Sequence, residues 1–362
     1  MITSRPSVIV VTYLPSPYQV ELFNAVADSG YCDLFVLYLC RREKTPVASN
    51  WAQPDIQHNH SFADAPDFDE VAATRKMLDG DLVVLNFYRH PVASRLLKMR
   101  AHSGKPWAFW GERPGVSGRG WVGRIARRIN LAALHRSRAP IWGIGNWAVA
   151  AWQAEFGFDR VYHDVPYFSD LSRFTWAANE AAPRDHQRIR FLFSGSLIER
   201  KGCDLIADAF GRLANDHRHV ELQWVGNGPM EEKLRSKLTQ CADRVTFHGF
   251  KDWKALPQVY AKADILLAPS RHDGWALVVP EGLASGLPVI TTPKVGAALE
   301  LIRHGENGWL VAPNDSEAVY RAMKQAVLAP VTMHENAKRS VASHQLSDGV
   351  SRFCGAIQSA II

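Results

Sequence analysis

Residues 191–202 have the sequence FLFSGSLIERKG, which passes from an apolar run through a tight turn toward a helix. The apolar residues at 191–193 have the length and composition of a strand buried on both faces. Gly195 interrupts that run, and Lys201 and Gly202 precede an amphipathic segment. Such a turn points backbone N–H groups and the positive end of a helix at one place, so it suits an anionic phosphate group. Taken alone, the segment also fits a surface lysine beside a glycine at a helix start.

The rest of the chain repeats this alternation of short apolar runs and amphipathic segments. In the second half we expect strands at Ile189–Phe193, Glu221–Val225, Val245–Phe247, Ile265–Ala268 and Pro288–Thr291, with helices at Cys203–Asn215 and Glu231–Leu238. In the first half we expect strands at Val8–Tyr13, Leu34–Leu39, Leu82–Phe87 and Trp107–Trp110, with a helix at Tyr18–Asp28. This rhythm predicts parallel sheets covered by helices.

The length of 362 residues favours two domains, each large enough to bury its own core. Residues 178–187 are rich in alanine and charge and lack periodicity, so they are interpreted as a linker. We expect one Rossmann-like domain over 1–177 and a second over 188–342. Two doubly wound domains of this kind would leave a cleft lined by the carboxyl ends of their strands, where a ligand should bind.

Composition excludes several classes of protein. No apolar run reaches the length of about 20 residues that spans a bilayer. The N-terminus lacks the pattern of a secretory signal, which predicts a cytoplasmic protein. The five cysteines show no spacing typical of metal ligands or a redox pair, so no metal is predicted. A net charge of +6 without a recognised binding motif argues against nucleic acid as a partner.

The most informative segment runs from Ala268 to Pro288. It places Asp273 in a loop after a strand and Glu281 in the first turn of the following helix, with seven residues between the two acids. The amides between them can hold a diphosphate, the first carboxylate a sugar, and the second the vicinal hydroxyls of a ribose. The structural alternative is that Asp273 caps a turn and Glu281 only complements the helix dipole.

Gly195 with Lys201-Gly202, Gly226 with Gly228-Pro229, the acid pair and Gly286-Leu287-Pro288 follow one another in this order. With this order the chain resembles retaining glycosyltransferases of the GT-B fold, family 4, also called glycosyl transferases group 1. The resemblance covers about half the chain and implies two doubly wound Rossmann-like domains facing across a cleft. It also implies a C-terminal helix over 343–362 that returns to the first domain. No cofactor is implied beyond the nucleoside diphosphate sugar that serves as donor. The resemblance implies two catalytic residues: Lys201, which would contact the donor diphosphate, and Asp273, which would contact the transferred sugar. The donor-binding residues implied are Gly195, Ser196, Lys201, Gly226, Phe250, Gly274, Trp275, Ala276, Leu277, Val278 and Glu281.

Three positions depart from the family pattern. Ser196 stands where the family commonly has arginine, so one charged phosphate contact is missing and Lys201 carries more of the load. Asp273 replaces the usual glutamate and has a shorter reach. Ala276 occupies a frequent glycine position, which still leaves its N–H available. These changes bear on the donor's identity more than on the reaction class.

The first half supplies the expected acceptor side. Ser16 and Pro17 predict a helix N-terminus in the first loop, in place of the family's glycine pair. Asn86, Tyr88 and His90 compete for the position after the strand at 82–87 where the family often has histidine, and we choose His90. A lone histidine in such a loop is also commonly structural. Glu112, directly after another strand, is a second candidate that could bind acceptor hydroxyls.

The stretch from Arg119 to Arg138 carries six arginines and no acid, with Trp121, Ile125 and Ile129 near helical spacing. A basic amphipathic helix of this kind can lie on an anionic lipid surface, which suits an enzyme with a lipid-linked acceptor. The alternative is that its apolar side packs on its own domain while the arginines are solvated. Both interpretations stay open at the level of the sequence.

Together these features predict a retaining, metal-independent hexosyltransferase that moves a sugar from a nucleoside diphosphate sugar to the hydroxyl of a glycan or lipid-linked acceptor. Its expected role is bacterial cell-surface polysaccharide, lipopolysaccharide or glycolipid synthesis. The expected location is the cytoplasm, peripheral on the inner face of the plasma membrane. The alternatives are a catalytically degenerate nucleotide-sugar-binding subunit, or an epimerase or phosphorylase of the same fold.

Overall fold

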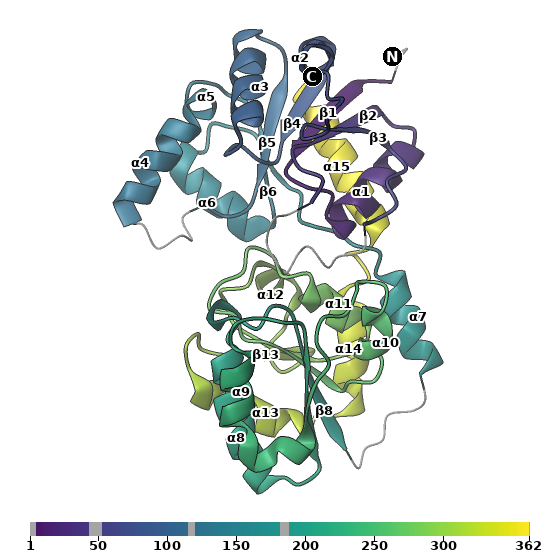
Figure 1. The fold of residues 1–362 in the computed structure, drawn as a ribbon, viewed down its shortest axis with the longest axis vertical. Coiled ribbons are helices and arrows are strands. Elements are labelled where there is room, and N and C mark those ends of the chain that lie inside the picture. Colours follow the sequence, from purple (N-terminus) through teal and green to yellow (C-terminus); the bar gives the residue numbers. More distant parts are fainter. Residues whose placement is uncertain (1–4, 43–52, 115–119, 182–187, 362) are drawn as a thin grey trace. The chain divides into compact units, whose positions relative to one another are not determined.

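The structure, a computed structural model, describes residues 5–42, 53–114, 120–181 and 188–361. These residues divide into two compact units. The first contains the described residues up to Ser169 together with 346–361, and the second contains the described residues from 170 to 345. Figure 1 labels the elements of both units, and each unit is treated by itself below.

The first unit is built on a parallel sheet of seven strands with the order β3-β2-β1-β4-β5-β6-β7. Its strands are β1 Ser7–Thr12, β2 Asp33–Tyr38, β3 Asn59–Phe62, β4 Leu82–Leu85, β5 Trp107–Gly111, β6 Ile141–Gly143 and β7 Tyr162–Asp164. Its helices are α1 Pro17–Asp28, α2 Glu70–Asp79, α3 Pro91–His102, α4 Gly120–Asn130, α5 Ala132–His135, α6 Asn146–Phe156 and α15 Leu346–Ile361.

The last helix of the chain, α15, completes the core of the first unit beside α1 (Figure 1). Phe353 of α15 is fully buried and makes edge-to-face ring contacts with three aromatic side chains. Its ring centroid lies 6.0 Å from that of Phe23, 5.6 Å from that of Trp110 and 5.3 Å from that of Trp142. Phe23 and Phe353, 330 positions apart in the sequence, therefore share one core.

The second unit is built on a parallel sheet of six strands with the order β10-β9-β8-β11-β12-β13. Its strands are β8 Ile189–Ser194, β9 Val220–Val225, β10 Val245–Phe247, β11 Ile265–Ala268, β12 Val289–Thr291 and β13 Gly308–Leu310. Its α-helices are α7 Ser172–Glu180, α8 Cys203–Asp216, α9 Glu231–Lys237, α10 Leu256–Tyr260, α11 Val278–Ala284, α12 Gly296–Leu301, α13 Ser316–Ala326 and α14 Val331–Ser340. Two 3₁₀ turns, η2 Glu199–Lys201 and η3 Thr239–Arg244, complete it.

Close contacts between backbones join the loops at the carboxyl end of the second sheet. The Gly195 N–H donates to Val225 O over 2.9 Å, and the Gly226 N–H donates to Gly249 O over 2.8 Å. Gly226 has a φ of 120°, and a Cβ atom placed on it would lie 2.0 Å from Gly195 O. Glycine is therefore required at this position by both conformation and space.

The boundaries between parts of the chain differ from those expected. Helix α7 extends to Glu180 and packs against α10 and α11, so the second unit begins at Asp170 instead of after residue 177. The residues 182–187 of the expected linker lie outside the described residues. Helix α15 starts at Leu346, and His344 still belongs to the second unit, where its ring lies 5.5 Å from that of Trp275.

The crowding at Gly226 predicts a sharp loss of stability on adding one methyl group. Gly226→Ala should lower the free energy of unfolding by about 2 kcal/mol or more, because the added Cβ atom meets a carbonyl oxygen and the φ angle is strained. Gly211→Ala is the matched control, since Gly211 lies inside α8 with open space around it. This control should gain about 0.5–1 kcal/mol. Urea unfolding of both variants measures the difference, and equal effects would contradict the argument.

Candidate functional site

Two loops of the second unit leave the same edge of its sheet side by side. Strands β8 and β11 pair directly and in parallel, so their carboxyl ends and the loops that follow lie together. From β8 the chain proceeds to β9 and β10 on one side of the sheet, and from β11 it proceeds to β12 and β13 on the other. The pair β8–β11 is thus the topological switch point, where open α/β sheets bind ligands.

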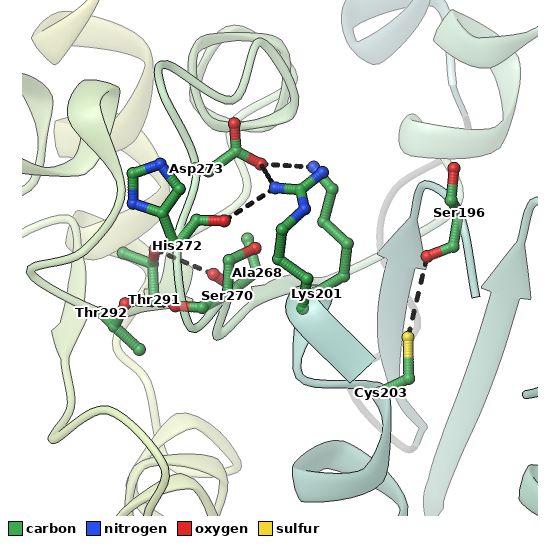
Figure 2. Close-up of polar contacts among 10 residues, drawn as sticks. Ser196, Lys201, Cys203, Ala268, Ser270, His272, Asp273, Thr291 and Thr292 are labelled. Atoms are coloured by element: carbon green, nitrogen blue, oxygen red, sulfur yellow. Dashed lines mark hydrogen bonds and ion pairs between the residues drawn. The ribbon is translucent and has the colours of Figure 1, made fainter. Parts of the chain in front are cut away.

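Lys201 and Asp273 meet at this switch point (Figure 2). Lys201 lies in η2 after β8, and its Nζ atom donates to Asp273 Oδ2 in the loop after β11. Arg200 contributes a second contact, with its Nη1 atom 2.7 Å from His272 O and 3.5 Å from Asp273 Oδ2. The two predicted catalytic residues of this unit are therefore joined in an ion pair.

The charge state of Asp273 follows from these contacts. Its side chain is largely buried, and burial alone would raise its pKa. The nearby positive charges of Lys201, Arg200 and His272 outweigh burial, so the pKa of Asp273 lies below its ordinary value. The carboxylate is ionised at neutral pH and can accept hydrogen bonds.

Backbone contacts hold the Asp273 loop in place. Thr291 Oγ1 donates to Ala268 O over 3.0 Å, and Thr292 Oγ1 donates to Ser270 O over 2.6 Å. The Asp273 N–H donates to Lys294 O over 2.9 Å. Because two threonine hydroxyls and one backbone carbonyl from the end of β12 and the residues after it hold this loop, the position of its carboxylate is defined by the sheet.

The segment 274–278 follows Asp273 and leads into α11. Gly274 is approached closely by α12, since a Cβ atom on Gly296 would lie 2.2 Å from Gly274 O. Trp275 is buried, so it offers the site its backbone and not its side chain. Ala276 has a φ of 69°, a left-handed conformation that favours glycine. This backbone explains why a glycine suits the position and shows that alanine is accommodated there.

Glu281 lies in the first turn of α11 and is buried. The hydroxyl of Tyr260 donates to Glu281 Oε2 over 3.3 Å, and it also hydrogen-bonds the side chain of Ser194 at the end of β8. Burial first, and then the charge of Glu281, raises the pKa of Tyr260 well above its ordinary value, so the hydroxyl stays protonated. Tyr260 thereby orients the Glu281 carboxylate at the same edge of the sheet.

The remaining predicted donor residues lie in the loops after β8, β9 and β10 and at the start of α11. The Gly195 and Gly226 backbones touch each other, and Phe250 follows Gly249, whose carbonyl receives the Gly226 N–H. Ser196 lies apart from the Lys201–Asp273 pair in Figure 2. Leu277 and Val278 are half-buried at the start of α11. The roles assigned to these residues stay predictions.

The two acceptor candidates lie in the first unit. His90 precedes α3 as its N-cap residue but makes no capping hydrogen bond, and its Nδ1 atom is buried without a partner among the described residues. Glu112 is exposed directly after β5, and its charge contributes to the raised pKa of the buried Tyr167, of which burial is the main cause. Asn86, weighed earlier against His90, accepts hydrogen bonds from Thr12 and Gln19.

Sequence reasoning missed three features of the site. Arg200 adjoins Lys201, so its position was visible, but its direction toward Asp273 was not. Tyr260 carries no motif that links it to Glu281. The threonine pair at 291–292 ends a strand, and its hydroxyls bond carbonyls that belong to a different loop. Within the described ranges no three histidine, cysteine or acidic side chains gather as metal ligands. Metal independence nevertheless stays a prediction.

Comparison with known families concerns this second unit. Residues 188–328 match the sequence profile of the family described as glycosyl transferases group 1. The match begins at β8 and includes the loops that carry Lys201, Asp273 and Glu281. The matched segment makes up less than half of the chain, and over this segment the chain is similar to that family.

Curated relatives match part of the chain. An uncharacterised glycosyltransferase of Methanocaldococcus jannaschii is 31% identical over 130 residues, which cover 35% of this chain and 33% of the relative. A lipopolysaccharide core biosynthesis mannosyltransferase of Rhizobium leguminosarum is 29% identical over 182 residues, which cover 46% of this chain and 50% of that protein. The chain thus spans half or less of the length of these curated relatives.

Solved structures resemble the chain over nearly its whole length. The Anabaena protein HepE, crystallised in complex with UDP and glucose, has a TM-score of 0.72 at 16% identity. The alignment covers 98% of this chain and 100% of HepE. The predicted fold class, a GT-B fold with two doubly wound Rossmann-like domains, is confirmed.

The backbone at Ala276 predicts that glycine is tolerated or preferred there. Relief of the left-handed conformation should gain about 1–2 kcal/mol, and the extra unfolded-state freedom of glycine should cost about 0.4–1 kcal/mol. Ala276→Gly should therefore be neutral or slightly stabilising in thermal unfolding. Ala322→Gly, inside α13, is the control and should lose about 1 kcal/mol. A loss of equal size at both positions would refute the role given to the φ angle.

Proposed function

We propose that the chain is a retaining glycosyltransferase that moves a sugar from a nucleoside diphosphate sugar to an acceptor hydroxyl. The observation that carries this proposal is the meeting of Lys201 with Asp273 at the switch point of the second unit. Glu281 is buried at the same edge and oriented by Tyr260. Its carboxylate would accept hydrogen bonds from the ribose hydroxyls of the donor. The similar Anabaena protein HepE binds UDP and glucose in its crystal structure, which supports a donor of this class.

In the proposed reaction the bond between the anomeric carbon and the donor diphosphate breaks, and a bond to the acceptor oxygen forms on the same face. Lys201 and the amides of 274–278 stabilise the negative charge that grows on the leaving diphosphate, which is the effect best able to lower the barrier. As the family resemblance implies, the departing phosphate accepts the acceptor's proton. Asp273 holds the sugar, and no metal takes part.

The acceptor is proposed to be a glycan or a lipid-linked sugar, bound by the first unit through His90 and Glu112. The curated relative named for lipopolysaccharide core biosynthesis supports a role in the synthesis of bacterial cell-surface glycans. With such an acceptor the enzyme would work in the cytoplasm, on the inner face of the plasma membrane.

Substitution of the two donor-site residues tests this function. Lys201→Ala should lower the rate of transfer by about 100-fold, because a charge that stabilises the leaving group is lost. Glu281→Gln should weaken donor binding by about tenfold, because a charged hydrogen-bond acceptor becomes neutral. Lys233→Ala and Glu232→Ala, both exposed on α9, are the matched controls and should behave like the wild type.

Transfer is measured as release of nucleoside diphosphate from a panel of UDP- and GDP-sugars, with and without oligosaccharide and glycolipid acceptors. Release that depends on an acceptor distinguishes a transferase from an epimerase, and binding without turnover would favour a degenerate binding subunit. NMR of the product gives its anomeric configuration. An inverted product would overturn the retaining mechanism and leave the donor site in place.

The surface of α4 supports a membrane as partner. Helix α4 exposes four large apolar side chains on one side: Trp121 (68% exposed), Val122 (52%), Ile125 (50%) and Ile129 (69%). Arg127, in contrast, turns inward, with its Nε atom 2.8 Å from Glu155 Oε2 and its side chain only 12% exposed. The apolar side of this helix is therefore exposed. One of the two earlier interpretations supposed that this side packs on its own unit, and the exposure contradicts it.

We propose that this apolar side enters the interface of an anionic membrane. The exposed Arg128, Arg136 and Arg138 lie on or close to α4, and the sequence 120–138 contains no acidic residue. Arg119 lies outside the described residues. A helix with an exposed apolar side and flanking cations suits the boundary between acidic headgroups and acyl chains. None of the helices in the described ranges has the length and apolar character needed to cross a membrane.

Co-sedimentation with vesicles tests this surface. The wild type should bind phosphatidylcholine vesicles that contain phosphatidylglycerol, and binding to pure phosphatidylcholine should be weaker. The double variant Trp121→Glu/Ile129→Glu should lose about tenfold or more in binding, because apolar burial is lost. Val71→Glu, an equally exposed position on α2, is the control. Unchanged binding by the double variant would refute the proposal, and a wild-type dimer that the double variant dissociates would assign the surface to self-association.

A further inference from the structure

Two adjacent basic side chains converge on one carboxylate at the switch point of the second unit. Lys201 Nζ and Arg200 Nη1 both contact the same oxygen, Asp273 Oδ2. Figure 2 shows Lys201 and Asp273 pointing toward each other. Asp273 carries one negative charge, so the three side chains together keep one net positive charge.

A third basic side chain nearby is engaged elsewhere. Arg271 makes a two-pronged contact with Asp204, with distances of 2.8 and 2.7 Å between nitrogen and oxygen atoms. It also donates to Glu199 O. Through these contacts the Arg271 guanidinium ties its own loop, which follows β11, to η2 and α8. Arg271 is therefore not directed at Asp273.

Arg200 differs from Arg271 in how firmly it is held. Its side chain is 48% exposed, and its shortest contact is the 2.7 Å hydrogen bond to His272 O. Its contact with Asp273, at 3.5 Å, is long for a hydrogen bond. Ser196, the position where a cation was expected and is absent, lies apart from this cluster in Figure 2. Arg200 can therefore turn toward an anionic ligand with the loss of few strong contacts.

We propose that Arg200 supplies the second phosphate-binding charge of the donor site, and that Asp273 holds Arg200 and Lys201 until the donor diphosphate displaces it. This inference rests on the proposed function. Each phosphoryl group of the donor carries a negative charge. The diphosphate can therefore balance the charges of both Arg200 and Lys201, whereas the Asp273 carboxylate balances only one of them. Displacement frees the Asp273 carboxylate to accept hydrogen bonds from the hydroxyls of the sugar.

The exchange of partners distinguishes the donor from the spent nucleotide. When a donor displaces Asp273 from the two cations, its sugar hydroxyls donate new hydrogen bonds to the Asp273 carboxylate. A nucleoside diphosphate without a sugar breaks the same contacts and leaves a buried charge without a new partner, which is unfavourable. Asp273 therefore competes with the product for the two cations and promotes its release after transfer.

Calorimetric titration with UDP and with GDP tests this exchange. Arg200→Ala should weaken binding of the nucleotide by about tenfold, as expected for one charged hydrogen bond. Arg212→Ala is the matched control, because Arg212 is an exposed arginine on α8 that pairs with Glu317. Asp273→Asn should instead bind the nucleoside diphosphate about tenfold more tightly than the wild type, because the competing charge is gone.

The outcomes separate the two proposals. If the wild type binds the nucleotide and Arg200→Ala binds it equally well, the role of Arg200 is wrong and the donor site stands. Weaker binding by a folded Asp273→Asn variant would overturn the exchange of partners. If the wild type binds neither nucleotide and turns over no donor, the proposed function itself fails. Because Arg200 is half-exposed, its alanine variant should fold, and circular dichroism checks this for both variants.

Discussion

The parallel pairing of β8 with β11 is the constraint on which the candidate site depends. Parallel strands that are neighbours must end at the same edge, so their following loops emerge together although 72 residues separate Lys201 from Asp273 in the sequence. The chain then turns to opposite sides of the sheet after each of these strands. Polar groups from the two loops therefore gather at one edge, as they do in the ligand sites of open α/β sheets.

The second sheet was largely predictable because its central strands are mainly apolar runs. The central strand Ile265–Ala268 and the edge strand Val245–Phe247 were both predicted at their observed bounds. The first sheet yielded less, since β3 (NHSF), β6 (IWG) and β7 (YHD) were not predicted. The strand β6 is buried but has only three residues. The strands β3 and β7 lie at the edges, pair on one side only and are half-exposed or more. Sequence patterns report burial, so a strand with little burial gives little signal.

The residues of the site were predictable one by one, but their contacts were not. Motif order identified Lys201, Asp273 and Glu281, yet it assigned separate ligands to the first two and did not foresee that they bond each other. Likewise, helical spacing identified an apolar side on α4 but left open whether that side was buried. Arg127 and Glu155 determine the answer, because their inward contact fixes the rotation of the helix. Such contacts depend on tertiary structure and leave no local pattern.

The packing of α15 affects the order in which the chain can fold during synthesis. The core around Trp110 and Trp142 lacks Phe353 until α15 has been made. The second unit needs only residues 170–345 and can assemble before that point. N-terminal domains usually fold first during synthesis, and this chain can depart from that order because its first unit needs a helix that follows the second. Until α15 has been made, part of the aromatic core of the first sheet stays uncovered.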